Sequence, residues 1–308
     1  MAVTSARSVL YSWVVEPLKI IASNRKALVG FIMLLFYIGM AIYGAFFVSP
    51  VLKPSCPPYL PPTLFRWPPS LSHPLGCDYM GYDIWVQLLL GAPAVLTIAF
   101  VAGFVTTAIG VAIGITSGYL GGLADTILMG ITDVAMTIPG LPLLIVLATV
   151  FFKALSNMPT WMCWIVIGLI LSVTAWAGLA RSIRSQVLSL RAREFIEAAK
   201  ALGLPTWHIV FREIMPNIMS YIAINFIFAT VGAIYASVGL YFLGLLPYTT
   251  TNWGVMLNYA YSQQGALYSL STIHYLLAPI IAIVGFQTAL ILFSYAVDEI
   301  FNPRLRAG

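Results

Sequence analysis

The stretch Ile84–Ala124, IWVQLLLGAPAVLTIAFVAGFVTTAIGVAIGITSGYLGGLA, contains no charged residue and decides the class of fold. A helix needs about 20 apolar residues, each rising about 1.5 Å, to cross the ~30 Å hydrocarbon core of a bilayer. The stretch is therefore long enough to cross a membrane and too long for one span. We expect a short interfacial helix near Ile84–Gly91 and a transmembrane helix near Pro93–Ser117.

The rest of the chain has the same apolar character. Of its 308 residues, 60% are hydrophobic and 8% are charged, and the mean hydropathy is +0.94, whereas soluble domains contain about 25% charged residues. Long unbroken apolar runs favour helices over a membrane β-barrel, whose strands alternate apolar and polar residues. The first run carries no charge from Ala27 to Leu52 and is longer than the apolar part of a signal peptide. We expect it to remain as a membrane helix.

The hydrophobic pattern predicts an all-α polytopic membrane protein with six transmembrane helices. They are Ala27–Val48, the helix within Ile84–Ala124, Thr126–Phe152, Trp161–Ala180, a helix that starts after Pro216 and runs to about Leu246, and His274–Val297. Asp133 lies early in the third helix, where an unpaired charge would be costly. We expect it to hold helix ends together near the inner interface rather than to contact a transport pathway.

Lysine and arginine are distributed unevenly between the connecting segments. With the N-terminus inside, twelve of the 15 basic residues fall in inner segments, and only Lys53, Arg66 and Lys153 fall in outer ones. Because cytoplasmic loops carry the excess of basic residues, both termini are expected in the cytoplasm. The same bias accounts for the net charge of +5 without a nucleic-acid partner. The predicted division is a cytoplasmic N-terminal segment (1–26), the first transmembrane helix (27–48), an extracytoplasmic loop (49–83), a core (84–302) with a cytoplasmic loop at 181–216, and a cytoplasmic tail (303–308).

The outer loop 49–83 is rich in proline, which makes a chain stiff and unable to form a helix. We expect an extended cap over the outer mouth. Its prolines are Pro50, Pro54, Pro57, Pro58, Pro61, Pro62, Pro68, Pro69 and Pro74. Cys56 and Cys77 share this loop, and a disulfide between them and two unpaired thiols both remain open. Cys163 lies in an apolar run and is expected to be a small core residue.

The longest cytoplasmic loop has helical character. Phe195, Ala198, Ala199 and Leu202 recur at helical spacing and predict a short helix over Arg193–Leu202. Gly203 is suited to the left-handed conformation that ends helices, and Pro205 to the first turn of a second helix. The small alanines allow another surface to approach, and Glu197 offers a carboxylate at the edge. This composition indicates docking to a partner rather than catalysis.

These residues also resemble a known family. The strings SLRAREFIEAAKALG (189–203) and REIMPN (212–217) are similar to the cytoplasmic loop of ABC importer permeases, in particular the dipeptide/oligopeptide branch. Further resemblances lie in HPLGCDYMGYD (73–83), GYLGG (118–122), Asp133 with Ile138-Pro139, FLG (242–244), WGVML (253–257) and NPRLR (302–306). They occur in the family's order over most of the chain and imply the type I importer permease fold.

The resemblance implies a division of labour among several subunits. A second homologous permease would complete the pathway, two ATPase subunits would bind ATP and Mg, and an extracytoplasmic binding protein would deliver the cargo. The residues that would couple this chain to an ATPase are Glu197, Ala198, Ala199, Gly203 and Pro216. The chain itself would sit in the cell membrane, with no catalytic residue, cofactor or metal of its own.

The cargo is less well defined than the machinery. Tyr82, Gln87 and Ser237 depart from the family's usual residues, two arginines and a glutamate, so oligosaccharides remain an alternative to peptides. Tyrosine and tryptophan runs could stack on sugar rings but are more typical of the membrane-interface belt. A membrane-embedded enzyme is disfavoured because no paired carboxylates or histidines cluster. A secondary transporter is disfavoured because only one of the six predicted spans, the one with Asp133, carries a charge.

Overall fold

The computed structural model describes residues 15–56, 69–248, 251–263, 266–268 and 272–301. The described part is helical, and its only strand-like pairing is an isolated bridge between Cys77 and Asp83. The helices are α2 (Glu16–Ser23), α3 (Arg25–Phe46), α4 (Ile84–Leu120), α5 (Gly122–Thr137), α6 (Gly140–Ser156), α7 (Thr160–Arg191), α8 (Glu194–Ala201), α9 (Thr206–His208), a π-helical segment (Ile209–Ile214), α10 (Met215–Phe242), α11 (Trp253–Ser262) and α12 (Ile273–Phe301). The expected all-helical fold is confirmed.

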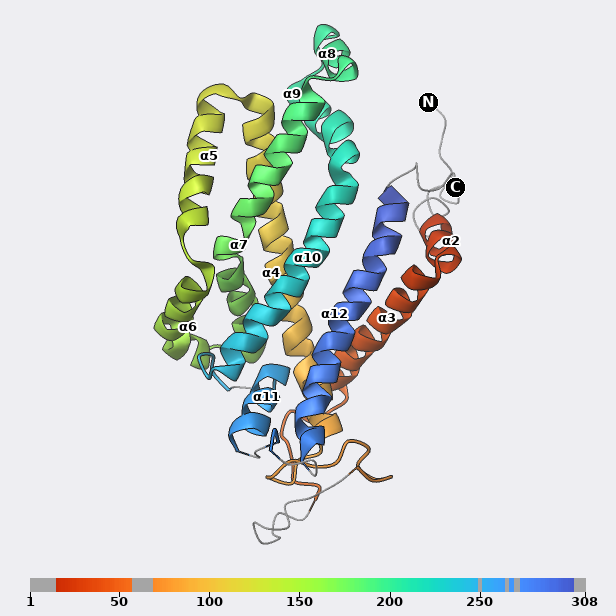
Figure 1. The fold of residues 1–308 in the computed structure, drawn as a ribbon, viewed down its shortest axis with the longest axis vertical. Coiled ribbons are helices and arrows are strands. Elements are labelled where there is room, and N and C mark those ends of the chain that lie inside the picture. The colour runs from red at the N-terminus through yellow and green to blue at the C-terminus, as the bar shows by residue number, and fades with distance from the viewer. Residues whose placement is uncertain (1–14, 57–68, 249–250, 264–265, 269–271, 302–308) are drawn as a thin grey trace.

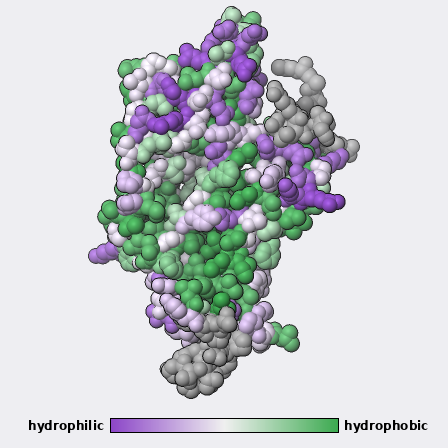
Figure 2. All heavy atoms as spheres, viewed as in Figure 1, coloured by the Kyte–Doolittle hydropathy of each residue, from purple (hydrophilic) through white to green (hydrophobic). Residues whose placement is uncertain are grey.

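Five of these helices are long and apolar enough to cross a membrane, and the bent pair α5–α6 makes a sixth if it counts as one span. Figure 1 shows the long helices side by side in a bundle, with α8 projecting from one end and α11 and residues 69–83 at the other. We call these the α8 end and the loop end. Hydrophobic atoms cover the middle of the visible face, whereas hydrophilic atoms gather around α8 and beside α2 (Figure 2).

Helix α4 is central to the packing. Its residues enter three hydrophobic clusters: Leu88 and Val95 pack with α3, α11 and α12, Ile98 and Ala102 with α6 and α7, and Ile115 with α7, α8 and α10. Glycines allow these close approaches, as expected for membrane helices. A Cβ atom at Gly103 would collide with Thr230 of α10, and one at Gly114 would lie 2.6 Å from the Ala180 carbonyl oxygen of α7.

The predicted division of Ile84–Ala124 into two helices is wrong. Helix α4 runs unbroken for 37 residues, with Pro93 inside it. Proline removes one helical hydrogen bond and leaves the carbonyl four residues earlier without its partner. That carbonyl, of Leu89, faces Gly44 of α3, and the adjacent Leu88 carbonyl accepts a hydrogen bond from Trp253 Nε1 at 3.0 Å. Contacts from other helices therefore support the backbone beside Pro93.

The third predicted span is not one continuous helix. The chain bends by 82° between α5 and α6, at Ile138-Pro139. Residues that precede proline are driven out of the helical region, and Ile138 is extended, with φ −76° and ψ 122°. The motif Ile138-Pro139 therefore marks a break that the hydropathy pattern did not reveal.

The fifth span also begins earlier than expected. A continuous helical path starts at Thr206 and reaches Phe242, so Pro216 lies inside it rather than before it. The π-helical segment directly precedes Pro216, and Met215 N donates to the Val210 carbonyl five residues back. The wider turn accommodates a proline that would otherwise clash with the preceding turn. Helices α2 and α11 were not expected, because neither is long enough to stand out in an apolar sequence.

Candidate functional site

Helix α8 is the most prominent feature of the α8 end. It begins at Glu194, and both Glu194 and Glu197 lie in its first turn, where a carboxylate interacts favourably with the helix dipole. Lys200 lies in the last turn, where a cation is favoured. The charges at both ends therefore support a helix too short to be stable alone in water.

Gly203 ends α8 in the conformation expected from the sequence. Its φ is +72°, and its N–H donates to the Lys200 carbonyl at 2.9 Å. The next N–H, of Leu204, donates to the Ala199 carbonyl at 3.2 Å. These two bonds form a Schellman motif, which satisfies carbonyls at the helix end and needs a left-handed residue at Gly203. The chain thereby reverses towards α9.

One face of α8 is anchored in the helical bundle. Ile196 is fully buried and Ala199 nearly so, and both pack in one cluster with Val187 of α7, Ile115 of α4 and the base of α10. The opposite face is open: Glu197, Ala198 and Gly203 are exposed, and Leu202 is 80% exposed. Of the helical face predicted from Phe195, Ala198, Ala199 and Leu202, Ala199 alone turns inward.

A cavity of about 740 Å³ adjoins the start of α8. It is bordered by Leu190, Arg193, Glu194 and Phe195, and by Asn217 next to Pro216. The exposed face of α8 and this cavity together form a surface with small, apolar and charged side chains. Pro216 is exposed and directly precedes Asn217, but it is not itself part of the cavity border. Such a surface can bind another protein, whereas no nucleophile with a base is brought together on it.

Two ion pairs join α5 to α7 below this surface. Arg184 donates to Asp125 through Nε at 2.5 Å and through Nη2 at 2.6 Å, and Arg181 donates to Asp133. Asp133 therefore links two helices, in line with a structural role. The pairing of Asp125 with Arg184 was not foreseen, although basic residues three positions apart lie on one side of a helix.

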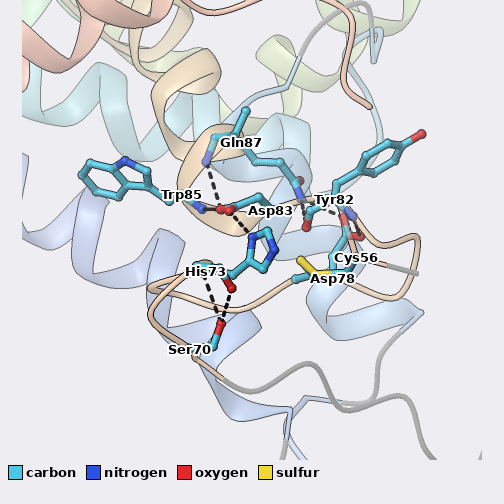
Figure 3. Close-up of polar contacts among 11 residues, drawn as sticks. Cys56, Ser70, His73, Asp78, Tyr82, Asp83, Trp85 and Gln87 are labelled. Carbon is cyan, nitrogen blue, oxygen red and sulfur yellow. Dashed lines mark hydrogen bonds and ion pairs between the residues drawn. A yellow bond between two sulfur atoms is a disulfide. The ribbon is translucent and has the colours of Figure 1, made fainter. Parts of the chain in front are cut away.

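At the loop end, Cys56 and Cys77 are joined by a disulfide, with their Cα atoms 6.5 Å apart. His73 lies beside them, and its Nδ1 is 2.7 Å from Asp83 Oδ2 (Figure 3). Ligand atoms of Cys56, His73 and Cys77 lie within 4.8 Å of one another, a cluster that spacing along the chain did not predict. Because metals bind thiolates rather than disulfide sulfurs, these residues form a structural staple as long as the disulfide is present. Cys163 is fully buried and free.

Two aspartates organise the start of α4 (Figure 3). Asp83 caps the helix, accepting from the N–H groups of Trp85 at 2.8 Å and Val86 at 3.3 Å. Asp78 Oδ1 accepts from the N–H groups of Met80 and Tyr82, both at 2.9 Å, and its Oδ2 accepts from Gln87 Nε2 at 2.8 Å. Burial raises the pKa of Asp78, although these hydrogen bonds oppose the shift.

The residues that depart from the family pattern fall in two places. Tyr82 and Gln87 lie in the Asp78 network, and Gln87 is 7% exposed. Ser237 is buried in α10 and donates to the Ile234 carbonyl at 3.0 Å. Tyr241 belongs to one of the aromatic runs considered as a sugar platform or an interface belt, but it is a core residue that is 1% exposed.

The comparisons with known proteins agree with this architecture. Residues 110–307 match the family described as the binding-protein-dependent transport system inner membrane component. The dipeptide transport system permease protein DppC of Bacillus subtilis is 34% identical over 238 residues, covering 76% of this chain and 69% of the relative. The oligopeptide transport system permease protein OppC of the same organism is 33% identical over 237 residues, covering 76% and 72%. The chain is thus a multi-pass membrane protein that belongs to the family of binding-protein-dependent transport system inner membrane components.

Proposed function

We propose that this chain is one permease subunit of an ATP-driven peptide importer and that α8 transmits the movement of a partner ATPase to the membrane helices. The observation that carries this proposal is the division of α8 into an open face with Glu197 and Ala198 and an anchored face with Ile196 and Ala199. A protein bound to the open face would push on α4, α7 and α10 through one continuous hydrophobic cluster. Gly203 and Pro216 would set the path of the chain between α8 and α10.

The proposed partners follow from the family to which the chain belongs. A second homologous permease forms the other half of the pathway, and an extracytoplasmic binding protein delivers the cargo. Two ATPase subunits bind ATP and Mg and hydrolyse the nucleotide, so this chain is a transport subunit and not an enzyme. Peptides are the proposed cargo because the relatives named above are dipeptide and oligopeptide permeases.

The test is uptake by the complete importer reconstituted in vesicles with its binding protein. We expect Glu197→Lys to abolish ATP-driven peptide uptake while the permease still inserts and assembles with its partner permease. Lys153→Glu is the matched control, because it reverses one exposed charge on α6, far along the chain from α8. Normal uptake by Glu197→Lys would reject the role of α8, and ATP-driven uptake of an oligosaccharide but no peptide would reject the cargo.

A further inference from the structure

A cavity of about 270 Å³ opens at the loop end and has no role in the coupling just described. Its lining comes from the segment that follows α3, from the segment that leads into α4 and the first turn of α4, from α11, and from the segment between α10 and α11. The side chains that matter for its chemistry are Asp78, Tyr82, Gln87, Tyr248, Met256 and Tyr259. The volume lies just below the range of about 300–1,000 Å³ that is typical of ligand sites, so the cavity suits one residue of a peptide rather than a whole peptide.

Aromatic rings form much of the wall. Tyr82, Tyr248 and Tyr259 all line the cavity, and the rings of Tyr248 and Tyr259 have centroids 5.9 Å apart. Tyr79 supports Tyr259 from outside the cavity, with the two centroids 6.2 Å apart. The faces of aromatic rings carry partial negative charge and attract ammonium groups, most strongly where water is partly excluded.

The wall of the cavity carries negative charge and no positive charge. Asp78 is the only residue in the lining with a carboxylate, and none of the lining residues is a lysine or arginine. Gln87 donates through Nε2 to Asp78 and, at 3.4 Å, to the Tyr82 carbonyl, which leaves its Oε1 as a further acceptor. A cavity with a carboxylate, a carbonyl-type acceptor and three tyrosines attracts a cation and disfavours a carboxylate ligand.

We propose that this cavity receives the α-ammonium group of the peptide cargo as the cargo enters the pathway from the binding protein. The proposal rests on the proposed function, because it needs the loop end to face the outside and the cargo to be a peptide. In this proposal Asp78 and Tyr259 recognise the ammonium group, and Gln87 holds Asp78 in place by its hydrogen bond. The chemistry that is recognised is a primary ammonium group next to the first side chain of the peptide.

The experiment measures the uptake of one lysine-free peptide, with a free or an acetylated amino terminus, by the complete importer. The measured quantity is the ratio of the two uptake rates relative to the ratio for the unmodified permease, so that selection by the binding protein cancels. We expect Asp78→Asn to reduce this preference by about threefold to tenfold and Tyr259→Leu to reduce it by about twofold to fivefold. A third peptide, acetylated but containing lysine, distinguishes the α-ammonium group from a side-chain ammonium group.

Matched variants separate charge from structure. In Asp78→Asn the amide of Gln87 can turn to accept from the new residue, and the pair Asp78→Asn with Gln87→Glu restores both the hydrogen bond and the negative charge. This double variant should recover the preference. Tyr268→Leu, at a residue that is 85% exposed and outside the cavity, should leave it unchanged.

The outcomes are distinct from those for the proposed function. Strong uptake with an unaltered preference in both Asp78→Asn and Tyr259→Leu would overturn the ammonium site and leave the importer intact. If the acetylated peptide that contains lysine is taken up as fast as the peptide with a free amino terminus, a side-chain ammonium group is sufficient. That result would also overturn the α-ammonium assignment. Absence of ATP-driven uptake in the unmodified complex would instead contradict the proposed function itself.

Discussion

At the scale of single residues, the environment of Gly203 shows why a helix end can matter for function. The residue has φ +72°, and a Cβ atom added to it would meet nothing within 4 Å. The need for glycine is therefore conformational and not steric. Side chains that tolerate the left-handed region should be accepted better than those that do not.

We predict a graded series at Gly203. Asparagine should be the mildest replacement, and alanine should destabilise the end of α8 by about 1 kcal/mol. Proline should be the most severe replacement, because it also removes the N–H that donates to the Lys200 carbonyl. The measurement is peptide uptake per ATP hydrolysed by the reconstituted importer. Equal ratios for the alanine and proline variants would contradict the coupling role of this turn.

At the scale of helices, how closely α3 can approach α4 depends on which way the glycines of α3 face. Gly44 is buried against the Leu89 carbonyl of α4, whereas Gly39 is exposed, and a Cβ atom there would have no neighbour within 4 Å. The two glycines share one helix and differ only in their neighbours. They therefore provide a matched pair for testing the contact beside Pro93.

We predict that Gly44→Ala lowers the free energy of unfolding by about 1–3 kcal/mol, because the added methyl group must push α3 away from α4. Gly39→Ala should be neutral or stabilising by up to about 1 kcal/mol, since alanine is the better helix former. Thermal unfolding of the purified permease in detergent measures both. Equal shifts in the two variants would show that the Gly44 contact has no special importance.

The segment before α4 is held by the bond between Cys56 and Cys77, which closes a loop with a sequence separation of 21 residues. Removal of such a bond costs about 3 kcal/mol in the chain-entropy description. We predict that Cys56→Ser makes the segment before α4 more sensitive to proteolysis, whereas Cys163→Ser, at a free thiol, does not. Peptide mapping of the non-reduced protein identifies the bond directly, and recovery of both cysteines as free thiols would refute it.

At the scale of the whole molecule, the loop end and the α8 end differ in charge and in shape. The orientation in the membrane is a prediction from the twelve-to-three distribution of basic residues. Lys53 and Lys200 are both exposed and lie towards opposite ends of the structure, so they report orientation without added tags.

We predict that a membrane-impermeant amine reagent modifies Lys53 in intact cells and Lys200 only in inside-out vesicles. The reason is that α8 belongs to the side with excess positive charge. Mass spectrometry of the labelled peptides is the measurement, and permeabilised cells, in which both lysines should react, are the control. Labelling of Lys200 in intact cells would reverse the proposed orientation and with it the assignment of the outer cavity.

The order of residues was enough to identify the class of the molecule and the helix on which the partner surface is proposed. An apolar stretch such as Ile84–Ala124 has no stable alternative to a membrane helix, and Gly203 is recognisable as a helix end because few residues adopt its conformation. Whether each helix is continuous and which side chains lie together could be read only from the folded protein. Pro93 and Pro216 lie within helices because neighbouring segments and a π-helical turn accommodate them, whereas Pro139 accompanies a break of 82°. Proline has the same local effect in all three cases, so the outcome depends on its surroundings, which are contacts from other helices at Pro93 and a π-helical turn at Pro216. Asp78 lies before α4 in the sequence and Tyr259 lies in α11, and only folding brings them to one cavity.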